Sequence, residues 1–224
     1  MRHLRAYRLR VTFIALLDAR PAAPEQGSAT ERIVDATLRC VARWGITKTT
    51  VDDVAREAGV GRATLYRLFP GGREALLDTV VAAETGRFFD RLDDRLVGVE
   101  SLEELLVNAI SEAAATLGGH PAFQFLLAHE PEAILPHRTF QRMDAVLRAV
   151  ATFGAPYLSP WLEGDDAPET AARASEWLAR LVISYLIAPS TDVDLGAIDS
   201  VRHLVRTYIL PGLTPGRPTP TNHS

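Results

Sequence analysis

Apolar residues recur every three or four positions along most of this chain, the spacing that places them on one face of a helix. The first such stretch begins near Ala29, after the linker-like residues 21–28, and Gly45 is expected to end it. The inward face of this helix is expected to carry Ile33, Ala36, Thr37, Cys40, Val41 and Trp44. The pattern therefore predicts an amphipathic first helix whose core includes an indole ring.

A second, shorter helix is predicted to begin at two threonines. Thr49 and Thr50 stand at its start, and Asp53 lies three residues after Thr50, which makes an acidic variant of the capping box. The residues expected to face inward are Val51, Val54, Ala55 and Ala58. The hydroxyl and amide groups at the start of this helix are placed to meet a phosphate.

A tight turn at Gly59 leads into a third helix over residues 61–69, which Pro70 ends. Leu65 and Phe69 lie four residues apart and are expected to pack inward on Val54, Ala58 and Trp44. The residues left to face outward are Arg62, Ala63, Thr64, Tyr66 and Arg67, although Tyr66 is alternatively a core residue. Short and cationic side chains on one face, with a packed opposite face, suit a helix that enters the major groove of DNA.

The rest of the chain continues in helices. A long helix is predicted over residues 73–96, and the further helical stretches are 102–117, 122–129, 139–153, 169–186 and 195–210. Glycines and prolines divide them, among them Gly118, Gly119, Pro131, Pro136, Pro156, Pro160 and Pro189. We find no alternating strand pattern and no internal repeat, so the predicted fold class is all-α.

Charge is distributed unevenly along the chain. The net charge is −4, yet residues 1–70 hold 12 Lys and Arg against 7 Asp and Glu. Residues 71–224 hold 12 Lys and Arg against 21 Asp and Glu. A basic N-terminal part on an acidic body fits a protein that presents only one end to DNA.

The run from Thr49 to Phe69, TTVDDVAREAGVGRATLYRLF, resembles the DNA-binding domain of tetracycline-repressor (TetR) family regulators. The resemblance extends back through the first helix and forward through Arg73 to Leu77. It departs from the family at Gly61, where a serine cap is usual, and at Leu68, where an aromatic residue or histidine is common. The resemblance implies an all-α homodimer with a three-helix reading head and a body that binds a small-molecule effector.

The resemblance also implies roles for individual residues. Those expected to contact DNA are Thr49, Thr50, Arg62, Ala63, Thr64, Tyr66, Arg67 and Arg73. The predicted division is a basic extension over 1–28, a helix-turn-helix domain over 29–72, a regulatory and dimerisation domain over 73–210 and a disordered tail over 211–224. The implied partners are double-stranded operator DNA, a second copy of the chain and an unidentified effector.

Two sets of apolar residues in the body are candidates for binding surfaces. Those that could line an apolar effector cavity are Phe123, Leu127, Phe140, Met143, Leu147 and Trp161. Those expected at a dimer interface between the last two helices are Leu178, Leu181, Val182, Tyr185, Val201, Leu204, Val205 and Tyr208. The alternative for one of these two helical stripes is that it packs only inward.

We find no pattern for catalysis or a cofactor. His120, His129, Glu130, Glu132 and His137 carry metal-ligating groups, but Pro131 breaks the helix that would align them and the second histidine of the H-E-x-x-H motif is absent. The single cysteine, Cys40, suits a reducing compartment, and no apolar run is long enough for a membrane helix. We therefore expect a cytoplasmic DNA-binding repressor that is not an enzyme; the alternative is a dimeric small-molecule-binding protein with little specific DNA affinity.

Overall fold

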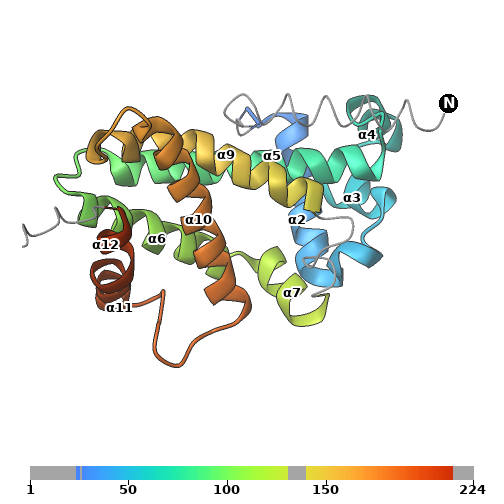
Figure 1. Cartoon of the computed structure of the whole chain (residues 1–224). Coiled ribbons are helices and arrows are strands. Elements are labelled where there is room, and N and C mark those ends of the chain that lie inside the picture. The colour runs from blue at the N-terminus through green and yellow to red at the C-terminus, as the bar shows by residue number, and fades with distance from the viewer. Residues whose placement is uncertain (1–23, 26, 131–139, 214–224) are drawn as a thin grey trace, which may run out of the picture.

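The computed structural model describes residues 24–25, 27–130 and 140–213, and the regular elements within these ranges are helices, without a strand. They are α2 (Ala29–Lys48), α3 (Val51–Glu57), α4 (Arg62–Leu68), α5 (Arg73–Leu96), α6 (Leu102–Gly118), α7 (Pro121–His129), α9 (Phe140–Leu158), the 3₁₀ turn η1 (Ser159–Trp161), α10 (Ala167–Ile187), α11 (Ile198–Leu204), the π-helical η2 (Val205–Ile209) and α12 (Leu210–Leu213) (Figure 1). The predicted all-α class is confirmed. The predicted extension over 1–28 lies largely outside the described residues.

Several helices begin where a side chain caps the first turn. The Ser28 hydroxyl accepts the Glu31 amide at 3.1 Å at the start of α2, and the Ser101 hydroxyl accepts the Glu104 amide at 3.1 Å before α6. At α7 the imidazole Nδ1 of His120 accepts the Phe123 amide at 3.2 Å. Such contacts satisfy amides that have no partner inside the helix, which is why these boundaries are close to the predicted ones.

Helix α9 is longer than predicted. The helix expected over 139–153 runs on to Leu158 and includes Pro156, which was expected to end it. A proline in the last turn removes one backbone hydrogen bond. Leu158, just beyond it, is 4% exposed and packs in the body core, and burial of this kind offsets such a loss.

The last helical segment is shifted toward the C-terminus. It begins at Ile198 instead of residue 195, because a turn forms before it in which the Asp194 carboxylate accepts the Gly196 amide at 2.8 Å. It continues through α12 to Leu213. Residues 211–213 therefore belong to a helix and not to the predicted tail, whose remainder lies outside the described residues.

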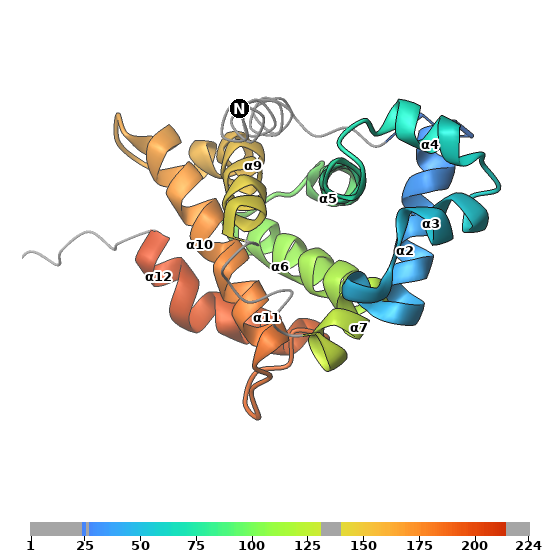
Figure 2. The same cartoon turned by 90° about the vertical axis from the view of Figure 1, so that its right-hand side faces the viewer.

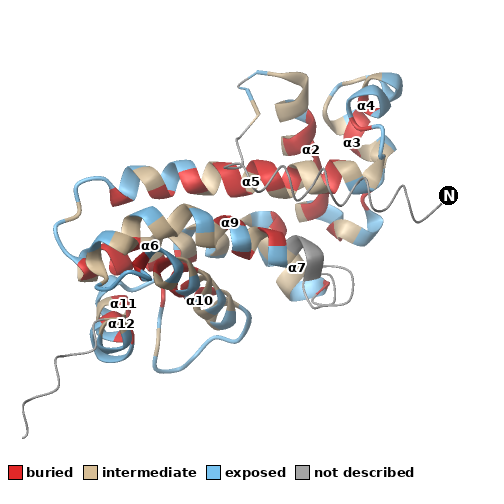
Figure 3. Ribbon diagram, turned by 45° about the horizontal axis from the view of Figure 1, so that its top comes forward, coloured by how far each residue is buried: buried red, intermediate tan, exposed pale blue. Residues whose placement is uncertain are grey.

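Two large hydrophobic cores, and a smaller cluster of Phe89, Ala145 and Ala149, organise the helices. The core of the reading head joins α2, α3, α4 and the first half of α5, through Ile33, Val34, Ala36, Cys40, Val54, Ala55, Leu65, Phe69, Leu76, Val80 and Ala83. The body core joins the end of α5 to α6, α10, α11 and η2. Buried positions follow α5 along its length (Figure 3). This helix connects head and body, and the predicted division at residue 72 cuts between helices that share a core.

The head lies at one end of α5 (Figure 1). Helix α7 lies beside α2, and α9 and α10 pack together in the body (Figure 2). Phe89 on α5 is fully buried and its ring stacks on Phe153 of α9, with centroids 4.3 Å apart and planes inclined by 2°. No helix in the described ranges is long and apolar enough to cross a membrane.

Candidate nucleic-acid interface

The short helix α4 is held to the head by its inward face. Leu65 is fully buried and Phe69 is 4% exposed, and both belong to the same core as Val54. This confirms the packing predicted from their four-residue spacing. Trp44 was expected in this core but is 38% exposed, and its ring lies 5.5 Å from the Arg43 guanidinium carbon at the surface.

The turn between α3 and α4 has the conformation that its glycine predicts. Gly59 has φ 64°, and a Cβ there would meet no atom within 4 Å. The Val60 amide reaches back to the Ala55 carbonyl at 3.0 Å. The left-handed backbone, which favours glycine, turns the chain directly from one helix into the next.

Helix α3 begins with the capping box predicted from Thr50 and Asp53. The Thr50 hydroxyl accepts the Asp53 amide at 3.2 Å, and the Asp53 carboxylate accepts the Thr50 amide at 3.3 Å. The Thr50 hydroxyl also donates to this carboxylate and is the main reason that the pKa of Asp53 lies below its ordinary value. Thr50 is exposed, so the start of α3 faces solvent.

Two of the predicted contact residues have structural roles. Thr49 is 6% exposed and its hydroxyl donates to the Gly45 carbonyl at 2.6 Å, so this side chain is not presented to DNA. The guanidinium of Arg73 donates to the carbonyl oxygens of Thr49, at 3.3 Å, and Ile46. Arg73 thus holds the last turn of α2 and the residue that follows it. Sequence reasoning missed both contacts because their partners are backbone carbonyls placed by the tertiary fold.

The outward face of α4 carries the groups that suit DNA. Arg62, Ala63, Tyr66 and Arg67 are exposed, and Thr64 is half-buried. Tyr66 is 41% exposed, so the alternative that it is a core residue is wrong.

Cationic groups on this face are accessible. The Arg62 Nε lies 3.0 Å from an Asp52 carboxylate oxygen, and the Arg62 guanidinium carbon lies 5.7 Å from the centre of the Tyr66 ring. Arg67 has no ion-pair partner in the part of the chain that the structure describes. The ion pair of Arg62 is solvent-exposed and therefore weak enough to exchange for a phosphate or a base.

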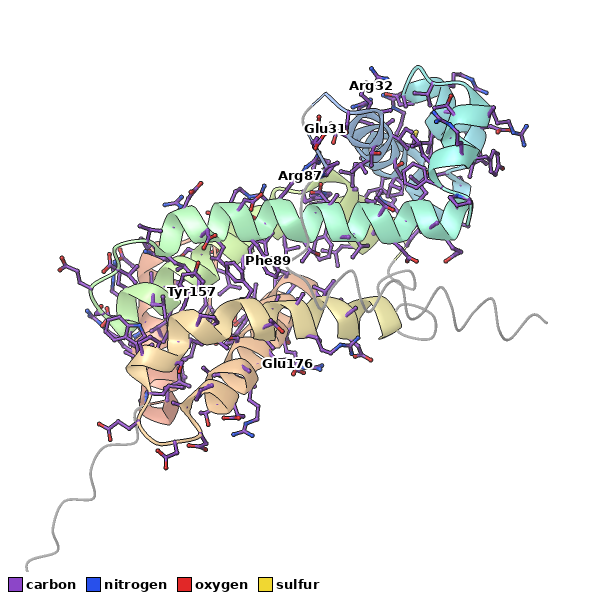
Figure 4. The ribbon with its side chains drawn as sticks, turned by 90° about the horizontal axis from the view of Figure 1, so that it is seen from above. Glu31, Arg32, Arg87, Phe89, Tyr157 and Glu176 are labelled. Carbon is purple, nitrogen blue, oxygen red and sulfur yellow. The ribbon has the colours of Figure 1, made fainter. Side chains whose placement is uncertain are left out.

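Polar contacts join the head to α5 and to the body. Arg87 of α5 lies 2.8 Å from Asp35 and 3.7 Å from Glu31, both of α2, and 2.7 Å from Glu84 (Figure 4). Glu84 in turn lies 3.1 Å from the Nε2 of His120, which caps α7. Burial raises the pKa of the Glu84 carboxyl, but the hydrogen bond to His120 and the Arg87 charge outweigh it and hold that pKa below its ordinary value.

The residues predicted to line an effector cavity are spread over α7, α9 and η1. Phe123 and Leu127 lie half-buried on α7, while Met143 and the buried Leu147 lie on α9. Trp161 lies in η1, beyond the far end of α9, about 27 Å along the helix from its start. The side chain of Phe140 lies outside the described residues. Trp161 therefore does not share a compact site with the first residues of α9.

The residues predicted at the dimer interface mostly pack inside one chain. Those that are 8% exposed or less and belong to the body core are Leu178, Val182, Val201, Leu204 and Val205. Leu181 and Tyr185 are half-buried against the same core, and Tyr208 alone of the set is open, at 67%. Five of the eight predicted residues are thus buried within one chain and do not form an exposed surface, whereas Tyr208 remains exposed.

The residues considered for a metal do not cluster. Within the described ranges no three His, Cys, Asp or Glu side chains come together in a way that could hold a metal ion. Glu130 instead accepts backbone amides of the head, and the Nδ1 of His129 lies 3.2 Å from the Phe125 carbonyl. Glu132 and His137 lie outside the described residues.

Comparison with known proteins agrees with this geometry. Residues 33–80, from α2 into α5, match the family described as bacterial regulatory proteins, tetR family. An HTH-type transcriptional regulator of Mycobacterium tuberculosis is 27% identical over 189 residues, which cover 84% of this chain and 86% of that protein. Residues 33–80 therefore form a DNA-binding domain of the tetR family. The chain is a DNA-binding transcriptional regulator, and the relative named here is also described as a transcriptional regulator.

The fold of this chain is shared by solved structures. The TetR-family repressor AlkX of a Dietzia strain, implicated in n-alkane biodegradation, superposes with a TM-score of 0.62 at 21% identity, covering 82% of this chain and 97% of AlkX. FadR of Bacillus subtilis, in complex with stearoyl-CoA, gives a TM-score of 0.58 at 21% identity, covering 79% and 97%. Head and body therefore form a fold common to these regulators.

Proposed function

We propose that this regulator is a homodimeric repressor of the TetR family that binds a palindromic operator through α4 and is released by a small apolar effector. The observation that carries the proposal is that α4 has one buried apolar face and one exposed face with cationic and polar side chains. Its inner face is fixed by buried Leu65 and Phe69, and its outer face presents Arg62, Tyr66 and Arg67 to solvent.

The chemistry of that outer face matches the major groove. An arginine guanidinium can donate two parallel hydrogen bonds to O6 and N7 of guanine, and a threonine hydroxyl can bond to several bases. Ala63 is short enough to let the helix approach the base edges. The exposed Thr50 at the start of α3 is placed to contact a phosphate, and Arg73 supports the segment before it.

A dimer would place two heads on successive major grooves, about 34–36 Å apart along the duplex. Large apolar side chains remain open on the last helices: Trp177 of α10 is 48% exposed, Ile198 of α11 is 52% exposed and Tyr208 of η2 is 67% exposed. Aromatic side chains are enriched at protein interfaces. We propose the outward faces of α10, α11 and η2 as the dimer interface, which keeps Tyr208 of the predicted set and replaces its buried members.

The proposed effector is a molecule with a long hydrocarbon part. Two structural neighbours support this class: FadR holds stearoyl-CoA, and AlkX is implicated in n-alkane degradation. The apolar side chains of α7 and α9, Phe123, Leu127, Met143 and Leu147, are the candidates to meet such a chain. A bound molecule would favour a conformation in which the two heads no longer match the operator.

Selection from random double-stranded DNA tests the proposed function. The purified protein is mixed with a random pool at several salt concentrations, and enriched fragments are sequenced over successive rounds. We expect a short palindrome whose half-sites lie about one helical turn apart. A folded dimer that enriches no sequence at any salt concentration would leave the alternative of a small-molecule-binding protein with little specific DNA affinity.

The proposed interface is tested by placing charge on it. We expect Trp177→Glu combined with Tyr208→Glu to convert a dimer into a monomer in sedimentation velocity, because a carboxylate buried without a partner opposes association strongly. Trp44→Glu is the matched control, since Trp44 is a 38% exposed aromatic residue on α2 of the reading head. A double variant that stays dimeric at the concentrations where the wild type does would contradict this interface.

A further inference from the structure

Gly45 was expected to end the first helix, but α2 kinks there and continues to Lys48. The short turn after this kink is held by side chains from other parts of the chain. Gly45 departs from helical geometry, with φ 82° and ψ 168°, and the following backbone groups need partners from outside α2. Arg73 of α5 donates to the carbonyls of Ile46 and Thr49. The two amides that follow Gly45 are satisfied by a residue more than 80 positions away.

That residue is Glu130, directly after α7. One carboxylate oxygen accepts the Ile46 amide at 2.7 Å, and the Thr47 amide lies 3.3 Å from both carboxylate oxygens. Glu130 is only 9% exposed. Hydrogen bonds from amides to a buried carboxylate are among the strong ones, so this contact is directional and firm.

The glycine makes room for this carboxylate. A Cβ placed at position 45 would lie 2.4 Å from one Glu130 carboxylate oxygen and 2.6 Å from the carboxyl carbon. The backbone conformation at Gly45 is also one that essentially only glycine adopts. The turn and the glutamate therefore fit each other as a pair.

Helix α7 reaches the head at both of its ends. It packs along α2 (Figure 2), and at its start His120 contacts Glu84, which pairs with Arg87 and through it with Asp35 of α2. At its other end Glu130 binds the turn after Gly45. A movement of α7 would thus pull on α2 and on the turn that precedes α3.

We propose that Glu130 is a positioning residue for DNA binding: it anchors the turn after Gly45 and thereby fixes the orientation of the reading head on the body. The inference rests on the proposed function. Glu130 touches no DNA; it sets the angle at which each head meets its half-site. Without it the turn loses two hydrogen bonds and the head samples orientations that do not fit both half-sites at once.

The test compares Glu130→Ala and Glu130→Gln with the control Glu104→Ala, whose carboxylate accepts a local amide, that of Glu100 at 3.0 Å, on the body. Amide hydrogen exchange is measured at Ile46 and Thr47 in the full chain. We expect Glu130→Ala to accelerate exchange there by about tenfold or more, while amides in α5 and α6 keep their protection. In Glu130→Gln, which keeps one acceptor oxygen, the exchange rates at Ile46 and Thr47 should lie between those of the wild type and those of Glu130→Ala.

Operator binding gives the functional part of the test. Affinity is measured for the selected operator and for DNA with a single half-site, at a temperature where every variant is folded. We expect Glu130→Ala to weaken operator binding by about tenfold or more and to leave half-site binding unchanged, because only the two-site complex requires a fixed head orientation. If the substitution had instead unfolded the head, binding to the operator and binding to the single half-site would both be lost.

Gly45→Ala supplies an independent check of the pairing. If the carboxylate occupies the space beside Gly45, this substitution should accelerate exchange at Ile46 more in the wild type than in Glu130→Ala, where the space is open.

Unchanged exchange at Ile46 and Thr47 in Glu130→Ala, or unchanged operator affinity in that variant, would overturn the proposal. A wild-type protein that selects no operator would overturn the proposed repressor function instead, and the exchange measurement would still report whether Glu130 anchors the turn.

Discussion

Replacing Arg62 and Arg67 together by alanine is expected to weaken binding to the selected operator by roughly 100-fold or more, because an arginine contact to DNA contributes about 1–3 kcal/mol. Both side chains are exposed on the outer face of α4, and neither belongs to the head core. The fold should therefore survive the double substitution. Fluorescence anisotropy of labelled operator at several salt concentrations measures the loss.

The salt series separates two kinds of contact. An arginine that meets a phosphate reduces the slope of log affinity against log salt by about 1 when it is removed, whereas one that reads a base relaxes specificity at one position. Arg91→Ala combined with Arg95→Ala is the matched control: it removes the same charge from the far half of α5, where both side chains lie near Glu112. Equal losses from the two double variants would mean that overall charge, and not α4, governs binding.

The ion pair between Arg62 and Asp52 bears on the size of this effect. Both side chains are solvent-exposed, at 67% and 47%, so their ion pair contributes little to the stability of the folded state. Arg62 can leave Asp52 for DNA at little cost in free energy. The loss of affinity in the variant then reports the contact to DNA and not damage to the head.

Phe89→Ala is expected to lower the free energy of unfolding by about 3–5 kcal/mol, the range for removing a large ring from a core. Phe89 is fully buried between α5 and α9, where its ring stacks on Phe153 and lies 5.7 Å from that of Phe88 (Figure 4). The substitution leaves a cavity between α5 and α9. Chemical denaturation followed by circular dichroism measures the change.

Two further substitutions calibrate that result. Phe89→Leu keeps most of the buried volume and should have a clearly smaller effect, while Val97→Ala, at a largely exposed position near the end of the same helix, should fall within about 0.5 kcal/mol of the wild type. If Phe89→Ala were as mild as Val97→Ala, the stacked rings would not be a stabilising element of this fold.

Much of the reading head could be predicted because the signals that define it are local. The capping box of Thr50 and Asp53, the positive φ of Gly59 and the inward pair of Leu65 and Phe69 all depend on residues within four positions of one another. Such interactions form between neighbours in sequence, so the spacing of residue types is enough to indicate them.

The outer surface of the body could not be predicted in this way. Helical periodicity identifies an apolar stripe, but it does not say whether another helix of the same chain or a second chain covers it. In the folded chain the stripes of α10 and α11 bury Leu178 and Val201, and the exposed apolar residues, such as Trp177, interrupt the polar face.

The sequence by itself therefore determined the all-α class, the helix-turn-helix and the residues that α4 presents, because helix caps, glycine turns and four-residue spacing act locally. Only the tertiary structure decided the roles of Trp44, Arg73 and Glu130. The indole of Trp44 lies outside the core, Arg73 braces backbone carbonyls, and Glu130 binds amides 83 and 84 positions away. Contacts between distant segments depend on how helices pack, and packing is fixed by the whole set of buried side chains together.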